Sequence, residues 1–436
     1  MSDLTFLDLP FDILSKIFKK LSLSDLGNVM LTCKILRKLI SEDSTIWRHF
    51  TNLFVRNSLS NRQSAITPYT LCRVSRNWCN GIYKPKILSY NTRYMPWLTF
   101  HESEAVVISL GSTICYYPTN KQGLKNVGYI WSVEVPKVQR NDIRTNDISR
   151  FVLKNNLLVC GNRDGCAIVY YFKGANQKPC LLHHIRDCHD EGHSEVTAVE
   201  LIDTESVSIV VTAAGTSPDL CYWYIKGKES DVNLTASQKY HDTLEVISAF
   251  HTNIEGVRCL ALNKSQTKLT IGPNGNSKPL LVDSHETTNN STPAIPGLRY
   301  SSKLAVRDVQ WHDENTIAYV THSGKLQFID TRTFEVVYDA KDPFLVTLYC
   351  VKTDGDRAIL AGSAAHSRCV LYDRRNCSCH VQMYFTSKRS SPVYSLDFDS
   401  TRLIAAADLN LASLNFNTRA DKRRQRDYSS FDFKIA

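Results

Sequence analysis

The chain has 436 residues, of which 43% are hydrophobic, so it can bury one large core or several; its formal net charge is +9 at pH 7. No apolar run approaches the ~20 residues that a membrane-spanning helix needs, and Asp3 and Asp8 stand where a secretory signal would carry basic residues. These features argue against membrane and secreted classes. We therefore expect a cytoplasmic or nuclear protein.

The fourteen cysteines are spread along the whole chain. Because there is no secretion signal, we expect reduced thiols that fill small apolar spaces and no disulfide framework. The positive charge is also widely distributed, so it is a weak indication of nucleic-acid binding.

Residues 1–50 have the apolar spacing of three short helices. The first is predicted to begin at Pro10, which suits a first helical turn, and to carry Ile13, Leu14, Ile17, Phe18 and Leu21. Ser24 is the predicted N-cap of the second, which carries Leu26, Val29, Met30 and Cys33. The third carries Ile35, Leu36, Leu39 and Ile40. Helices this short are not stable singly, so we expect them to pack together and leave an apolar face for a partner.

This segment, "LDLPFDILSKIFKKLSLSDLGNVMLTCKILRKLISEDSTIWRHF", resembles an F-box in its Leu-Pro start, its spaced aliphatic residues, the cysteine of its second helix and its late Trp47. The resemblance implies binding of a Skp-type adaptor of a cullin–RING ubiquitin ligase through Leu9, Pro10, Ile13, Leu14, Ile17 and Leu26. Some of these positions must also be internal core, and Trp47 and Cys33 are expected to be core. The alternative is a small helical domain packed on its own body.

Residues 51–90 are predicted to be a connector with helical turns. From 91 to 418, short β-rich runs recur, and the equivalent positions in them are Tyr116, Tyr170, Trp223, Val282, Ile329, Tyr372 and Leu414. The last three steps between them are 47, 43 and 42 residues, and the earlier ones are 54, 53 and 59. A period of about 40 to 45 residues is typical of WD-type propeller blades. Seven anchors therefore predict a seven-bladed β-propeller with insertions in its first half.

Other blade features support this interpretation. Asp164-Gly165 and Ser323-Gly324 suit the tight turn between the second and third strands of a blade, and Gly192-His193 matches the Gly-His dipeptide of WD repeats. A single blade cannot bury both of its faces, so the ring must close. The strand "KILSY", from Lys86 to Tyr90, is the candidate for completing the last blade.

The whole chain is similar to the F-box/WD repeat proteins, and within them to the dactylin subfamily. Three stretches carry the closer resemblance: "VSRNWCNG" with "YMPWLTF", "TLYCVKTDGDRAILAG" with "LYDRRN", and "SSPVYSLDF". The implied fold is mainly β with a small α domain: a three-helix F-box followed by a seven-bladed WD-type β-propeller.

Some F-box/WD receptors bind phosphorylated targets through arginines at two recurrent blade positions. By that resemblance Arg258 and Arg307 lie early in a first strand, and Arg163 lies in a turn between strands. Guanidinium groups suit the task because they make bidentate, charge-assisted bonds to phosphate or carboxylate. The alternative for each arginine is a surface salt bridge or a solvated side chain.

Two further features have plainer explanations. Cys180, His183, His184, Cys188, His189 and His193 are dense enough for a zinc site, but we expect a flexible insertion between blades. Cys377, Cys379 and His380 are expected in a loop after blade six. Residues 419–436 hold six basic and three acidic residues and are predicted to be a solvated tail, with nuclear targeting or an acidic partner as alternatives.

The sequence offers no phosphate-binding glycine loop, nucleophile elbow or paired catalytic carboxylates. We expect a non-catalytic subunit without cofactor or metal that binds the adaptor with its F-box and target proteins, phosphorylated in some cases, with its propeller. The alternative is a scaffold propeller that binds an acidic partner or nucleic acid, with the helical head as an internal clamp.

Overall fold

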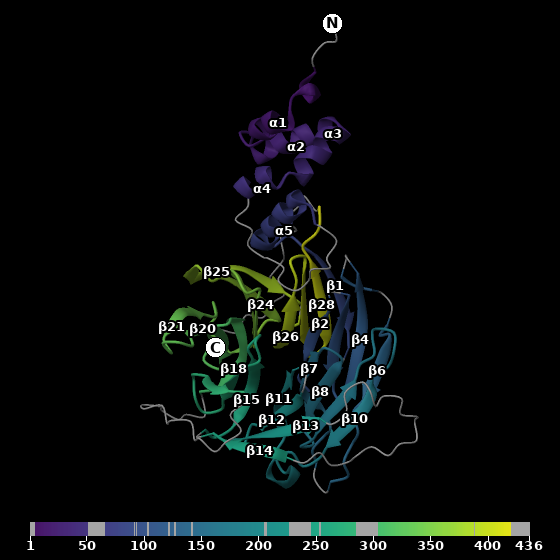
Figure 1. The fold of residues 1–436 in the computed structure, drawn as a ribbon, viewed down its shortest axis with the longest axis vertical. Coiled ribbons are helices and arrows are strands. Elements are labelled where there is room, and N and C mark those ends of the chain that lie inside the picture. Colours follow the sequence, from purple (N-terminus) through teal and green to yellow (C-terminus); the bar gives the residue numbers. More distant parts are fainter. Residues whose placement is uncertain are drawn as a thin grey trace.

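The computed structural model describes residues 5–50, 66–225, 246–284 and 304–419, except positions 91, 93, 103, 121–122, 126–127, 141–142, 205–206, 253 and 388. Over these residues the chain forms a helical head, a bridging helix and a ring of seven β-sheets (Figure 1). The predicted fold class is therefore confirmed. Residues 51–65 of the predicted connector and 420–436 of the predicted tail lie outside the described part.

The head contains one more helix than predicted. Its elements are η1 (Phe6–Asp8), α1 (Phe11–Phe18), α2 (Leu23–Thr32), α3 (Lys34–Glu42) and α4 (Ser44–Phe50). Ser22, and not Ser24, caps α2: its hydroxyl accepts from the Asp25 amide, and the Asp25 carboxylate accepts from the Ser22 amide. This reciprocal capping box satisfies two amides of the first turn, so it favours a start two residues earlier than predicted.

The four helices surround one small core that contains Leu14, Phe18, Leu26, Met30, Leu36, Ile40, Ile46 and Trp47. Trp47 is 3% exposed, and its Nε1 donates to the Ile40 carbonyl over 2.6 Å. Cys33 lies against the same core and caps α3 through its sulfur. The prediction that Trp47 and Cys33 belong to the core is confirmed.

Helix α5 (Pro68–Asn80) connects the head to the ring. It begins at the N-cap Thr67, with proline at its first position, and ends at Gly81, whose φ of +64° suits a glycine. Its first turns contact the head, where Tyr69 packs against Trp47 with ring centroids 5.1 Å apart. Its last turn is inserted between the final two blades. One helix therefore contacts both bodies.

Five of the seven sheets are meanders of consecutive strands; in blade 1 both β5 and β6 pair with β4, and in blade 7 the outer strand comes from an earlier part of the chain. Blade 1 contains β2 (Leu98–His101), β3 (Ala105–Leu110), β4 (Thr113–Asn120), β5 (Gly123–Leu124) and β6 (Trp131–Glu134). Blade 2 contains β7 (Ile148–Lys154), β8 (Leu157–Asn162), β9 (Ala167–Tyr171) and β10 (Cys180–Ile185). Blade 3 follows η2 (Asp190–Gly192) and contains β11 (Val196–Asp203), β12 (Ser208–Ala214), β13 (Asp219–Ile225) and β14 (Val246–His251).

Blade 4 contains β15 (Val257–Leu262), β16 (Lys268–Pro273) and β17 (Leu280–Asp283). Blade 5 contains β18 (Val306–Asp313), β19 (Thr316–Thr321), β20 (Lys325–Asp330) and β21 (Val336–Lys341). Blade 6 contains β22 (Leu348–Thr353), β23 (Ala358–Ser363), β24 (Arg368–Asp373) and β25 (Asn376–Phe385). Blade 7 contains β26 (Val393–Phe398), β27 (Arg402–Ala407), β28 (Asn410–Asn415) and, as its outer strand, β1 (Lys84–Ser89).

The seven anchors predicted from the repeat lie on equivalent strands. Each is buried and belongs to the third strand of its blade: β4, β9, β13, β17, β20, β24 and β28. The two predicted tight turns are also confirmed, because Gly165 and Gly324 have φ of +78° and +75° between second and third strands.

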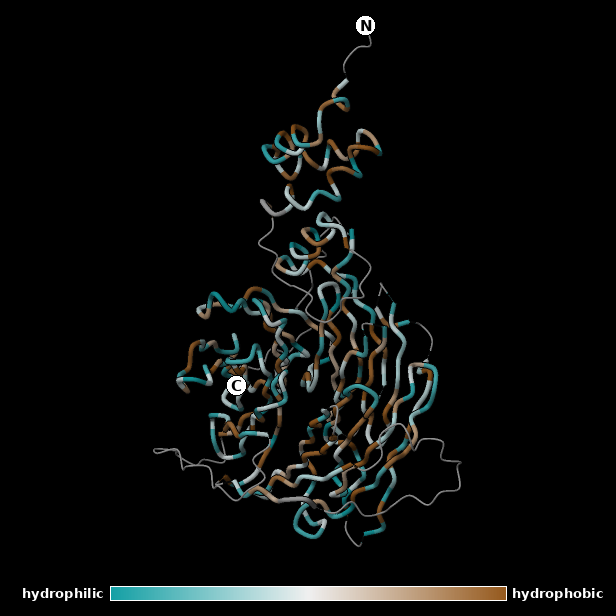
Figure 2. Tube along the Cα trace, viewed as in Figure 1, coloured by the Kyte–Doolittle hydropathy of each residue, from teal (hydrophilic) through white to brown (hydrophobic). Residues whose placement is uncertain are grey.

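The ring closes by two means. Strand β1 pairs antiparallel with β28, so the prediction for the strand from Lys86 is confirmed, and the end of the predicted connector belongs to the propeller sheet. In addition, each of the seven junctions between neighbouring blades contains a buried apolar cluster. Figure 2 shows hydrophobic stretches in the strands of the ring and hydrophilic residues at many of its turns.

Two segments predicted as an insertion and a loop instead form β-strands, each with an irregular register. Cys180, His183 and His184 lie in β10, and Cys377, Cys379 and His380 lie in β25. Both are outer strands of their blades, with more exposed side chains than the inner strands. The polar composition of such an edge hides its β structure from an apolar pattern.

Candidate functional site

The exposed apolar residues of the head form the first candidate surface. Leu9, Ile13 and Ile17 are 38%, 41% and 37% exposed, and Pro10 is also exposed. Ile13 and Ile17 are four residues apart and lie on the same side of α1. Leu14 and Leu26, which we also expected to contact the adaptor, are 2% and 0% exposed. They support the surface from inside the head.

Other exposed apolar residues of the head were not predicted as contacts. Phe11, Leu31 and Ile35 are 49%, 81% and 57% exposed and lie in α1, α2 and α3. Leu31 is in the last turn of α2, and Ile35 follows at the start of α3. Periodicity alone could not find them, because an apolar residue of a small domain can face either its core or a partner.

The second candidate surface is on the ring, at the face where the innermost strand of each blade begins; we call it the entry face. Near this end the innermost strands of blades 2 to 7 each contain a β-bulge, at which one residue is skipped by the pairing register. The skipped residues, which we call the bulge ring, are Ser149, Thr197, Arg258, Arg307, Tyr349 and Tyr394. Bulges direct a side chain away from the regular alternation.

All six residues of the bulge ring line one cavity of about 60 Å³, which we call the mouth cavity. Its other lining residues are Tyr94, Met95 and Trp97 of blade 1 and Arg150 of blade 2. Because equivalent residues of successive blades surround it, the cavity lies on the axis of the ring. Arg258 and Arg307, predicted separately from two blades, are thus brought together.

The two arginines of the bulge ring, Arg258 and Arg307, have no carboxylate partner among the described residues. Among the described residues, Arg258 bonds the Asn274 side chain at 3.4 Å, and one Arg307 nitrogen lies 2.9 Å from Nδ1 of His322. The Arg307 Nε is buried and has no hydrogen-bond partner there. Burial lowers the pKa of Arg307, and the nearby positive charge of Arg258 lowers it further. Two like charges close together with spare donors favour an anion between them.

Arg163, the third predicted arginine, is at the rim. Its Nε bonds Glu195 at 2.9 Å, and its guanidinium lies over the ring of Tyr94, 4.8 Å from the centroid. Arg163 therefore makes a surface salt bridge, which was the alternative expected for each arginine. Tyr94 connects it to the mouth cavity, but its charge is already matched.

A contact across the ring lies at the inner end of the mouth cavity. Arg150 of blade 2 bonds Asp308 of blade 5 at 2.9 Å, donates to the Arg307 carbonyl, and lies 4.1 Å from the ring centroid of Trp97. Below this contact lies a second cavity of about 370 Å³ between the innermost strands, and Arg150 and Trp97 line both cavities. Sequence reasoning did not find Arg150, since no local pattern indicates a partner 158 residues away.

The histidine and cysteine segment does not assemble a metal site. Within the described part of the chain, no group of three or more His, Cys, Asp or Glu side chains is arranged to hold a metal ion. His189 is instead a buried core residue: its Nε2 lies 3.1 Å from the Thr212 hydroxyl, which also accepts from the Trp223 indole. His193, assigned to the Gly-His dipeptide, is exposed.

The buried histidines predict loss of stability on acidification. Burial lowers the pKa of His189 and of His312 to about 4. The unfolded chain, with an ordinary value near 6.5, takes up these protons first, so stability is complete above about 6.5 and falls as the pH drops towards 4. At pH 5 each histidine costs about 2 kcal/mol. Urea unfolding at pH 7 and pH 5 measures this loss.

A matched pair of variants isolates the role of His189. His189→Gln is expected to weaken the pH dependence of the urea midpoint, whereas the exposed control His193→Gln keeps the wild-type dependence. An unchanged pH dependence in His189→Gln would contradict the assignment.

Comparisons with known proteins find similarity in both the head and the propeller. Residues 6–52 match a family model described as F-box-like. Over 423 residues the chain is 22% identical to F-box/WD repeat-containing protein 4 of Mus musculus and, equally, of Homo sapiens. These alignments span 94% of this chain and 92% of each relative.

No helix among the described residues is long and apolar enough to cross a membrane.

Proposed function

Because the chain belongs to the F-box/WD repeat family, we propose that it is the substrate-recognition subunit of a Skp–cullin–F-box ubiquitin ligase. The head would bind a Skp-type adaptor and, through it, the cullin–RING assembly. The entry face of the propeller would hold the target protein. The chain would contribute proximity and orientation to ubiquitin transfer, because the partner proteins would carry out the transfer chemistry.

The observation that carries the proposal is the exposed apolar stripe on the head. A domain of this size would ordinarily bury isoleucines such as Ile13 and Ile17, and exposed apolar patches mark contact sites for proteins. The head keeps its own core of Leu14, Leu26 and Trp47 while these side chains remain outside it. The surface is therefore suited to an apolar partner without unfolding of the head.

A co-purification experiment tests the adaptor surface. Ile13→Asp combined with Ile17→Asp is expected to reduce recovery of a Skp-type adaptor by about 30-fold or more, because it places two charges in an apolar contact. The control is Ile143→Asp, which changes an isoleucine that is fully exposed on the propeller. Equal recovery of the adaptor with all three proteins, or no recovery with the wild type, would refute the proposal.

The bulge ring supports the second half of the proposal. Six blades direct one side chain each towards the same axial cavity, and two of these side chains are arginines without a carboxylate partner among the described residues. We propose Arg258 and Arg307 as the residues that bind an anionic group of the target. Arg163 would contribute at the rim, and only after exchanging its bond to Glu195.

A further inference from the structure

The shape and the lining of the mouth cavity indicate which kind of anionic group it can bind. It is a narrow pit of about 60 Å³, and its inner end is lined by Trp97 and by Arg150, which bonds Asp308 across the ring. A chain that runs across the entry face can send only a side chain into such a pit. A chain that ends there can enter with its last residue.

The hydrogen-bonding character of the pit differs between its two sides. On the side of blades 4 and 5, Arg258 and Arg307 present only donors. On the side of blades 2 and 3, the hydroxyls of Ser149 and Thr197 donate to the carbonyls of Val196 and Val257, each over 2.6 Å. Their hydrogens are therefore engaged within the ring, and their oxygens remain as acceptors.

This combination matches the end of a polypeptide. The last residue carries a carboxylate, which accepts bidentate bonds from guanidinium, and an amide N–H, which donates. A phosphate ester offers acceptors on all sides and would meet the engaged hydroxyls of Ser149 and Thr197. It also carries more charge, and a dianion loses more hydration energy than a monoanion in a narrow cavity between aromatic rings.

The walls are suited to the rest of the terminal residue. Tyr349 and Tyr394 follow the arginines around the ring, with ring centroids 5.2 Å apart, and Tyr94 and Met95 lie on the side of blade 1. Aromatic walls of this kind pack against an apolar or small side chain. The cavity therefore combines an anion site, a site for an amide N–H and an apolar wall.

We propose that the mouth cavity binds the free C-terminal carboxylate of a partner polypeptide, with Arg258 and Arg307 holding the carboxylate and Ser149 and Thr197 accepting the last amide N–H. The proposal deepens the proposed function, on which it rests, by naming the substrate class: proteins recognised by their C-terminal end. Capture of a backbone carboxylate is a known mode of peptide recognition.

The test uses the purified full-length chain and three pools of synthetic ten-residue peptides with degenerate sequences. One pool has free C-termini, the second is amidated, and the third is amidated with one central phosphothreonine. The immobilised protein is expected to retain the free-acid pool about tenfold or more over both amidated pools. Equal retention of the acid and amidated pools, or preferred retention of the phosphorylated pool, would overturn the proposal.

Variants connect the retention to the arginines. Arg258→Gln and Arg307→Gln, each made singly, are expected to lose the preference for the free acid. The control Arg332→Gln, an exposed arginine in the turn between β20 and β21, is expected to keep it. Melting midpoints show that each variant is folded, and the acid-to-amide comparison on the wild type needs no variant. An undiminished acid preference in both arginine variants would contradict the assignment.

Adaptor binding is measured on the same proteins so that the two proposals can fail separately. Arg258→Gln and Arg307→Gln are expected to retain the adaptor at the wild-type level. Adaptor recovery without any preference for free acids would remove the C-terminal proposal alone. Preference for free acids without adaptor recovery would remove the ligase role and leave the peptide site.

Discussion

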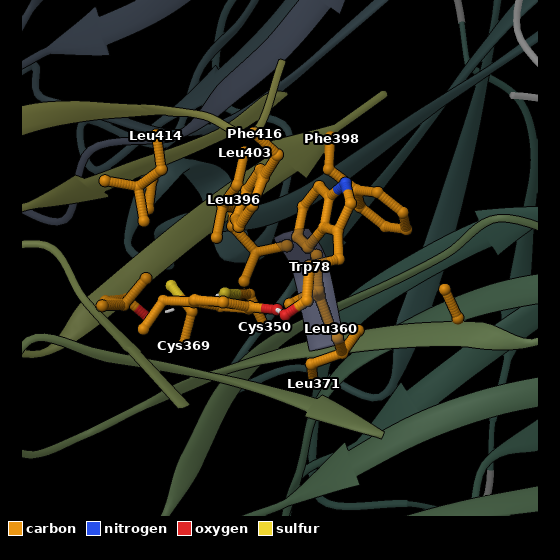
Figure 3. Packing of buried hydrophobic residues seen from close by; sticks show 14 of the residues in the cluster. Trp78, Cys350, Leu360, Cys369, Leu371, Leu396, Phe398, Leu403, Leu414 and Phe416 are labelled. Atoms are coloured by element: carbon orange, nitrogen blue, oxygen red, sulfur yellow. Dashed lines mark hydrogen bonds between the residues drawn. The ribbon is translucent and has the colours of Figure 1, made fainter. Parts of the chain in front are cut away.

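Trp78→Ala is expected to lower the free energy of unfolding by about 3–5 kcal/mol, because the indole fills the junction between α5 and the last two blades. Trp78 is fully buried and stacks on Phe416 with ring centroids 3.6 Å apart (Figure 3). Its Nε1 donates to the Ser400 carbonyl over 2.8 Å, and the Tyr384 hydroxyl donates to its backbone carbonyl over 2.7 Å. Alanine would leave a cavity and an unsatisfied carbonyl.

The measurement is urea unfolding of the full chain, followed by limited proteolysis. Trp78→Phe is the matched control: it keeps an aromatic ring against Phe416 and removes the indole bond and part of the ring volume, so a smaller loss is expected. Proteolysis of Trp78→Ala should cleave near α5 before the ring is digested, since α5 is the helix that contacts both bodies. Wild-type unfolding and wild-type cleavage would show that α5 is not a structural connection.

Asp342→Ala is expected to be comparably destabilising, by about 3–5 kcal/mol, because it leaves an unpaired buried charge. Arg368 and Asp342 are both fully buried, and one Arg368 nitrogen bonds both Asp342 oxygens over 2.5 and 2.7 Å. Asp342 also accepts the amides of Phe344 and Val346, so it shapes the loop between blades 5 and 6.

The double variant Asp342→Leu with Arg368→Met distinguishes loss of the pair from creation of an orphan charge. Replacing both partners with apolar residues is expected to recover much of the stability lost in the single variant, since a buried ion pair offsets little more than its own desolvation. Thermal unfolding measures all three proteins, with Arg332→Ala as an exposed control that leaves the midpoint unchanged. A double variant as unstable as the single one would refute this explanation.

The repeat architecture could be read from the sequence because it depends on spacing. An anchor residue must return once per blade to the third strand, and this constraint survives even where the Trp-Asp pair of WD repeats is absent. The closing strand was predictable for the same reason, since one blade lacked a partner at the end of the chain. The short head was predictable from helical periodicity and its resemblance to an F-box.

The site was only partly predictable. Arg258 and Arg307 could be assigned to equivalent places in their blades, but the bulge that directs them to the axis is a feature of strand register and leaves no composition signal. The Arg150–Asp308 contact joins distant blades, so it depends on closure of the whole ring. In the head, Leu14 and Ile13 have the same chemistry, and only packing decides which of them is exposed.

Hydrogen exchange of the full chain with and without a purified Skp-type adaptor tests the central claim most directly. We expect the adaptor to slow exchange in residues 6–35 of the head and to leave the innermost strands of the propeller unchanged. Protection of the entry face of the propeller by the adaptor, or protection of no segment of the head, would contradict adaptor binding through the head.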